Sequence, residues 1–159
     1  MFFPRFILNG VLFWFSYACA AQVIELSPKP ELTPEQVVQF QISALQHNDD
    51  PQPDSGIERT FRFASPSNKE ITGPLEHFIQ IVRAPAYLPL INSLSSKIVG
   101  VVMGDEHSEV AVEIQSSDGQ QFRYLFVLTK QSSGDLAGCW MTDSVVPVKT
   151  DKSSQGETI

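Results

Sequence analysis

Cysteine, histidine and clustered positive charge are scarce in this sequence, and each scarcity narrows what the protein can be. Only two cysteines and three histidines occur among the 159 residues, and no spacing among them matches a known catalytic or metal-binding signature. Lys and Arg number 11 against 18 Asp and Glu, the net charge is -7, and the basic residues form no run. We therefore expect no nucleic-acid partner, because binding to phosphates needs clustered positive charge.

The first 20 residues have the pattern of a secretory signal peptide. Arg5 precedes an apolar stretch from Phe6 to Tyr17, and Ala18-Cys19-Ala20 is a small-residue cleavage site. We expect cleavage before Ala21, export to the periplasm or the medium, and no stable membrane insertion afterwards. The apolar stretch is shorter than the roughly 20 residues of a spanning helix. Two alternatives stay open: an uncleaved anchor, and lipidation of Cys19.

Cleavage would leave Cys139 as the last cysteine, so no intramolecular disulfide could form. Cys139 lies between Gly138 and Trp140 in an apolar stretch, and we expect it to be a small buried hydrophobic residue. We interpret residues 21–32 as an extended lead-in, 33–148 as one domain and 149–159 as a disordered tail.

The domain changes its hydrophobic period near Asn92. Before this point, three helix starts are predicted, at Thr33-Pro34, at Ser55-Gly56-Ile57-Glu58 and at Thr72 to Pro74, with Pro66 to Ile71 as a corner. After it, four stretches alternate as strands do, over 97–103, 109–114, 121–129 and 136–146. The pattern predicts an α+β fold, with three N-terminal helices packed on a curved antiparallel sheet of about four strands that closes into a cone. Both faces of the third strand are apolar enough to predict cover on both sides.

The stretch GIERTFRFASPSNKEITGP, from Gly56 to Pro74, resembles a family of bacterial and plant domains of unknown function. The resemblance covers roughly Leu32 to Val148 and rests on the Phe-Ala-Ser-Pro-x-Asn corner with Gly-Pro downstream. That family is similar to the nuclear transport factor 2-like, or cystatin-like, superfamily. The resemblance implies the cone fold and no activity, because one fold hosts many functions.

Acid–base chemistry would start from the histidines, which titrate near neutrality. We expect His47 to follow a helix end, His77 to face solvent and His107 to lie in a turn. The paired carboxylates have structural readings too: Asp49 and Asp50 as turn residues, Glu109 and Glu113 as a solvated strand surface. The sequence therefore predicts no catalytic residue, no metal site and no cofactor.

The FASPSN corner is the candidate binding site, because it brings polar groups beside aromatic rings. One interpretation is structural, with Ser65 and Asn68 satisfying backbone groups where a helix stops. The functional one places Phe63, Ser65, Asn68, Tyr87 and Trp140 at the mouth of an apolar pocket. Arg62 or Arg83 could then hold a carboxylate.

We favour an exported, non-catalytic module that binds a small apolar ligand or a protein partner. One alternative is a cone-pocket enzyme of isomerase, dehydratase or hydrolase type, which needs a histidine or carboxylate of shifted pKa facing the cavity. The other is a structural adaptor that forms a homodimer through the outer face of the sheet, where Leu125 and Val127 would otherwise be exposed.

Overall fold

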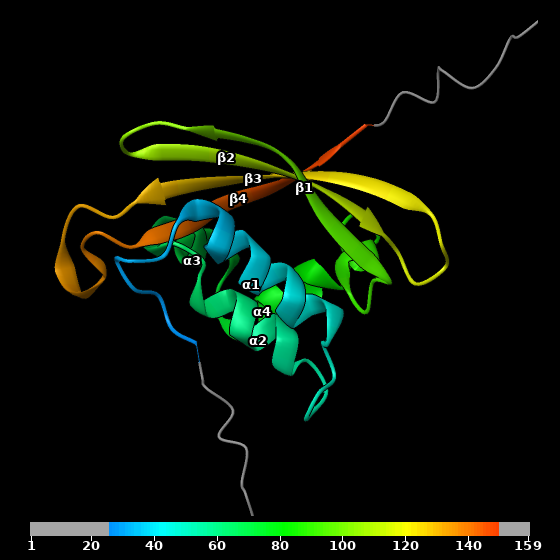
Figure 1. The fold of residues 1–159 in the computed structure, drawn as a ribbon. Helices are drawn as coiled ribbons and strands as arrows, with labels where there is room; N and C mark the ends of the chain where they lie inside the picture. Colours follow the sequence, from blue (N-terminus) through cyan, green and yellow to red (C-terminus); the bar gives the residue numbers. More distant parts are fainter. Residues whose placement is uncertain (1–25, 150–159) are drawn as a thin grey trace, which may run out of the picture.

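The computed structural model describes residues 26–149, in which helices cover one face of a curved antiparallel sheet (Figure 1). The helices are α1 (Pro34–Gln46), α2 (Ser55–Arg62), α3 (Pro66–Thr72) and α4 (Leu75–Val82), and the strands are β1 (Ser95–Met103), β2 (His107–Gln115), β3 (Gln121–Lys130) and β4 (Trp140–Val148). Two 3-10 turns, η1 (Leu88–Leu90) and η2 (Gly134–Leu136), complete the set. The predicted α+β fold class is confirmed. The predicted signal peptide, the first part of the lead-in and almost all of the tail lie outside the described residues.

Helix α1 begins as its sequence predicts. The Thr33 hydroxyl accepts from the Gln36 backbone at 3.3 Å, and the Gln36 side chain accepts from the Thr33 backbone at 2.9 Å, which is a capping box. Its inward face buries Val37, Val38, Ile42 and Leu45 to 2% exposure or less. Burial of each such side chain contributes about 1.5–3 kcal/mol.

The capping box predicted for α2 is wrong. Asp54 is the N-cap, in the left-handed region at φ 65°, and it makes no capping hydrogen bond from its side chain. The Ser55 hydroxyl instead donates to the carbonyl oxygens of Asn48 at 3.1 Å and Asp50 at 2.8 Å. Ser55 thereby ties the start of α2 to two carbonyls of the loop that precedes it.

The stretch expected as a corner is helix α3. Pro66 occupies its first turn, where the missing N–H has no cost, and the Ser65 hydroxyl accepts from the Asn68 backbone at 3.1 Å. Thr72 ends this helix and does not cap the next one. Its hydroxyl donates to the Asn68 carbonyl at 2.9 Å, and Pro74 precedes α4 without a side-chain cap.

The strands follow one another across the sheet in the order β1-β2-β3-β4, each antiparallel to its neighbour. Val110, Tyr124 and Phe126 face the helices and are 0–1% exposed. Leu125 and Val127 lie on the opposite, outer face, which no helix covers in Figure 1, and they stay half-buried. The expectation that β3 is covered on both faces is therefore wrong for the described residues.

Among residues 26–149, none of the helices has the length and hydropathy needed to cross a bilayer.

Candidate functional site

An inner cavity of about 240 Å³ lies between the helices and the β4 side of the sheet. Nine of its 14 lining residues are hydrophobic, and they come from every layer around it, including Leu45 of α1, Phe78 and Val82 of α4, Leu90 of η1 and Phe126 of β3. The polar lining residues are Thr60, Asn68, Thr72, Asp143 and Ser144. Ile71 belongs to the lining and is 79% exposed, so it lies at the opening. A mostly apolar cavity with a few polar groups is the usual form of a small-molecule site.

Asn68 holds the corner of the cavity against β4. Its amide nitrogen donates to the carbonyls of Thr142 at 3.2 Å and Asp143 at 2.8 Å, while its amide oxygen accepts from the Thr72 hydroxyl at 2.7 Å. The neighbouring Ser65 donates from its backbone to the Thr142 carbonyl at 2.9 Å. The polar groups of the FASPSN corner are therefore largely engaged within the protein.

Two tyrosines tie the loop after α4 to the sheet. The Tyr87 hydroxyl donates to the Val145 carbonyl at 3.1 Å, and the Tyr124 hydroxyl donates to the Ala86 carbonyl at 2.9 Å. Burial, together with the nearby Tyr87, raises the pKa of Tyr124 to about 12. Tyr124 therefore stays protonated at neutral pH and acts as a hydrogen-bond donor.

A chain of side-chain hydrogen bonds runs across the strand ends next to α3. The Thr129 hydroxyl donates to the Asp143 carboxylate and lies 3.3 Å from Nδ1 of His107. Ser67 donates to the same carboxylate at 3.5 Å, and its hydroxyl is 2.9 Å from that of Ser65. Asp143 is the only lining residue of the inner cavity that bears a charge. Sequence reasoning missed Asp143, although a lone acidic residue within an apolar strand was a visible signal.

The five residues predicted for the pocket do not all meet. Asn68 and Tyr87 both line the inner cavity. Phe63 is 3% exposed and lines a different hollow, described below, while Ser65 and Trp140 are buried at 1% and 7% exposure and line neither. Whether any of the five contacts a ligand stays a prediction.

A family model described as a domain of unknown function, DUF4864, matches residues 29–153. The chain belongs to the DUF4864 family. The match spans the whole of the helical layer and the sheet, including the inner cavity. No curated protein matches the chain, and no solved structure does.

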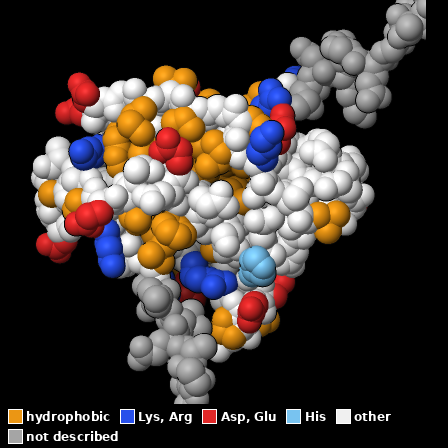
Figure 2. All heavy atoms as spheres, viewed as in Figure 1, with side chains coloured by type: hydrophobic (Ala, Val, Ile, Leu, Met, Phe, Trp, Pro, Cys, Tyr) orange, Lys and Arg blue, Asp and Glu red, His pale blue; other side chains and the backbone are white. Residues whose placement is uncertain are grey.

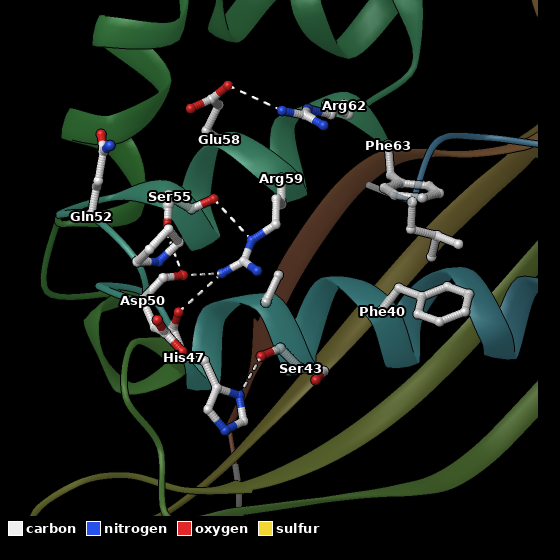
Figure 3. A pocket seen from close by; sticks show the side chains of 13 residues that line it. Phe40, Ser43, His47, Asp50, Gln52, Ser55, Glu58, Arg59, Arg62 and Phe63 are labelled. Carbon is white, nitrogen blue, oxygen red and sulfur yellow. Dashed lines mark hydrogen bonds and ion pairs between the residues drawn. The ribbon is translucent and has the colours of Figure 1, made fainter. Parts of the chain in front are cut away.

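A second hollow in this DUF4864 domain, the outer groove, lies between α1, α2 and the loop that joins them, with a volume of about 750 Å³ (Figure 3). Arg59 crosses it and donates to the carbonyls of Ser55 at 3.2 Å, His47 at 3.1 Å and Asp50 at 2.9 Å. Phe40 and Phe63 stack at the other end, with ring centroids 6.5 Å apart. The Arg59 guanidinium, at the centre of the outer groove, thus holds the α1–α2 loop in place.

The two arginines considered for carboxylate binding are paired within the domain. Arg62 bonds to Glu58 at 3.2 Å and lines the outer groove, while Arg83 bonds to Asp54 at 2.7 Å. Neither lines the inner cavity. The structure therefore gives that cavity no arginine with which to hold an anion.

The remaining candidates from the sequence do not line the inner cavity. His47, His77 and His107 are exposed, and Cys139 is 2% exposed, where burial raises the pKa of its thiol above the usual value. Glu113 pairs with Arg123 on the outer face. Within residues 26–149, no three His, Cys, Asp or Glu side chains come close enough together to hold a metal ion.

Proposed function

We propose that this protein is an exported, non-catalytic module that binds a small apolar ligand in the inner cavity. The observation that carries the proposal is the composition of the cavity wall, which is hydrophobic at nine of 14 lining residues. The volume of about 240 Å³ is larger than that of an apolar protein cavity of roughly 150 Å³ that binds benzene. A ligand somewhat larger than benzene, with one small polar group, fits these walls.

The polar groups at the wall favour a neutral ligand. Asn68, Thr72 and Tyr87 each donate to the protein's own oxygen atoms, and Asp143 accepts from Thr129 and Ser67. An anion would meet a carboxylate-bearing residue and no arginine or lysine among the lining residues. Toluene and 1-hexanol are accordingly suitable probes, with hexanoate as the charged counterpart.

Methyl-resolved NMR titration of the purified protein tests this proposal. Toluene or 1-hexanol should shift the methyl signals of Leu45, Val82 and Leu90, and hexanoate should shift them much less. Ile71→Asp, at the opening, should weaken binding at least threefold, because it replaces apolar contact with a charge. Leu88→Asp is the matched control, since Leu88 is also exposed, at 52%, and does not line the cavity. If the neutral probes leave these methyl signals unchanged at saturating concentration, the inner cavity is not a ligand site.

Export is a further part of the proposal and rests on the arrangement of Arg5, the apolar stretch and Ala18-Cys19-Ala20. Intact mass spectrometry of the protein recovered from the periplasm of a Gram-negative host should show a chain that starts at Ala21. A lipid-modified Cys19, or a full-length chain held in the membrane fraction, would contradict cleavage.

We also propose a relationship to the nuclear transport factor 2-like superfamily. Its support is the arrangement of a curved four-stranded sheet with the described helices on one face, together with the FASPSN motif. A solved structure that superposes on this sheet and its helices in the same chain order would test the relationship, and a different order would refute it.

A further inference from the structure

In the part of the chain that the structure describes, other segments cover the β4 edge of the sheet and leave the β1 edge uncovered. At the β4 edge, Phe63 to Ser65 pair with the strand as a parallel bridge between Ala64 and Thr142. Ser65 donates to the Thr142 carbonyl at 2.9 Å, and the Thr142 backbone donates to the Phe63 carbonyl at 2.8 Å. This short pairing occupies the strand's outward backbone groups.

Further along β4, side chains donate hydrogen bonds to the backbone carbonyls of the strand. The Asn68 amide donates to the Asp143 carbonyl at 2.8 Å, and the Tyr87 hydroxyl donates to the Val145 carbonyl at 3.1 Å. Pro147 follows and has no N–H to offer. The β4 edge is thus blocked against another strand over most of its length.

The β1 edge has no such cover in the part of the chain that the structure describes, where β2 is the strand that pairs with it. Its second half is apolar and open to solvent: Val99, Val101, Val102 and Met103 are 40%, 38%, 68% and 56% exposed. Figure 2 shows hydrophobic side chains gathered in the upper part of the molecule, where the sheet lies, with charged side chains set among them. A long, apolar, uncovered edge strand is a template for pairing with another strand.

The bulge in β1 decides which residues share a face. Ile98 pairs with Val112 and Val101 pairs with Val110, so both lie on the inner face, whereas Lys97 and Val102 pair with Glu113 and Glu109 on the outer face. The register shifts between Ile98 and Gly100, which moves the side-chain alternation by one residue at Val99.

We propose that the β1 edge binds β1 of a second copy of this chain, antiparallel and across a two-fold axis perpendicular to the sheet. In a register centred between Val99 and Gly100, the two β1 strands overlap along almost their whole length. Because the bulge shifts the side-chain alternation by one residue, inner-face residues of one copy then lie beside inner-face residues of the other. Lys97 of each copy then lies opposite Val102 of the other, and Ile98 lies opposite Val101. Ile98 and Val101 thus form apolar pairs near the centre, Lys97 and Val102 flank them, and Gly100 leaves room at the axis.

Charge does not oppose a second copy in this arrangement. Lys97 is the one charged residue of β1, and in this register it does not face its own counterpart. It lies opposite Val102, and Asp105 and Glu106 of the other copy are three to four residues further on, about 10–13 Å along the strand. The register therefore places no like charges opposite each other, and the two lysines lie on either side of the apolar centre of the paired strands.

Sedimentation velocity over a concentration series tests the edge pairing. The purified protein should be a dimer in reversible exchange with monomer. Val99→Lys places two positive charges beside the axis and should raise the dissociation constant at least tenfold. The matched control is Val146→Lys, which adds the same charge at a 47% exposed valine on the outer face of β4 and should change the constant less than twofold. Circular dichroism should show both variants folded.

Disulfide trapping tests the register itself, in a chain that also carries Cys19→Ser. Lys97→Cys with Val102→Cys should cross-link two copies on mild oxidation, since the two positions lie opposite each other. Val102→Cys alone should not, because the two introduced thiols would be about 17 Å apart along the strands, beyond disulfide reach. A protein that is monomeric throughout the series, or a dimer that survives Val99→Lys, overturns the proposal. A dimer that dissociates with Val146→Lys alone assigns the interface to the outer face instead.

Discussion

Asn68 has the densest set of interactions in the FASPSN corner. It is 8% exposed, and it satisfies two carbonyls of β4 and one hydroxyl of α3 at the same time. An amide is the side chain that can donate twice and accept once at a single point, which explains why Asn occupies this position.

Asn68→Asp should destabilise the domain by about 3 kcal/mol, since it removes both donors and turns a carboxylate towards two carbonyls. Urea unfolding followed by circular dichroism measures the change. Ser67→Ala, at the exposed neighbour, should stay within about 0.5 kcal/mol of the wild type. Equal stability of Asn68→Asp and the wild type would show that the corner does not depend on this amide.

Gly56 sets the distance between α1 and α2. A Cβ atom at this position would lie 2.1 Å from the Ala44 carbonyl oxygen and 2.7 Å from the Asn48 Cα. Both neighbours are backbone, so neither can turn aside, and the helices would have to separate.

Gly56→Ala should therefore destabilise the domain by about 3 kcal/mol, at the upper end of the range for overpacking. Gly100→Ala is the comparison, because its Cβ would meet the nearest atom at an ordinary 3.7 Å. Thermal unfolding of the two variants side by side checks the prediction, which fails if they melt together.

At the scale of elements, one buried side chain joins three of them. Gln41 of α1 donates to the Thr60 carbonyl of α2 at 3.3 Å and accepts from the Thr142 hydroxyl of β4 at 2.7 Å. All three residues are 2–6% exposed, so each polar group depends on the others.

Gln41→Leu should cost about 2 kcal/mol, because it leaves the Thr142 hydroxyl buried without its acceptor. The double variant Gln41→Leu with Thr142→Val should recover part of this loss, since both polar partners are then removed. A double-mutant cycle from chemical unfolding measures the coupling between the two side chains. Simple additivity of the two costs would mean that the bond contributes little.

The sequence predicted elements more accurately than contacts. Local signals identified the start of α1 at Thr33, the change of period near Asn92 and the four strands, because capping and alternation involve residues close in the chain. The sequence allowed a structural role for Asn68 in satisfying backbone groups but could not predict its partners, since Thr142 lies 74 residues away. For the same reason the pocket prediction placed Trp140 beside Asn68, although Trp140 belongs to the hydrophobic core and does not line the inner cavity.

At the scale of the whole molecule, Tyr124 links stability to alkaline pH. Its pKa is raised from 10.0 to about 12 in the folded protein, so folding favours the protonated ring. This contribution is fully present below pH 10 and is lost as the pH rises from 10 towards 12. The wild type should therefore lose stability across that interval.

Tyr124→Phe should cost about 1 kcal/mol at neutral pH, through loss of the hydrogen bond to Ala86, and should flatten the decline between pH 10 and 12. Melting temperatures of both proteins between pH 7 and 12 provide the measurement. Parallel declines in the two proteins would assign the alkaline loss to other groups.

Helix α3 lines the inner cavity and also helps to cover the β4 edge of the sheet. If the β1 edges pair as proposed and the β4 edge stays covered, each subunit of residues 26–149 offers one edge for strand addition, so growth along the hydrogen-bonding direction ends at two molecules. A variant in which both α3 and the bridge at residues 63–65 were displaced would give each subunit two such edges and would allow open-ended polymerisation into cross-β filaments. We therefore expect the cover on the β4 edge to protect against fibril formation as well.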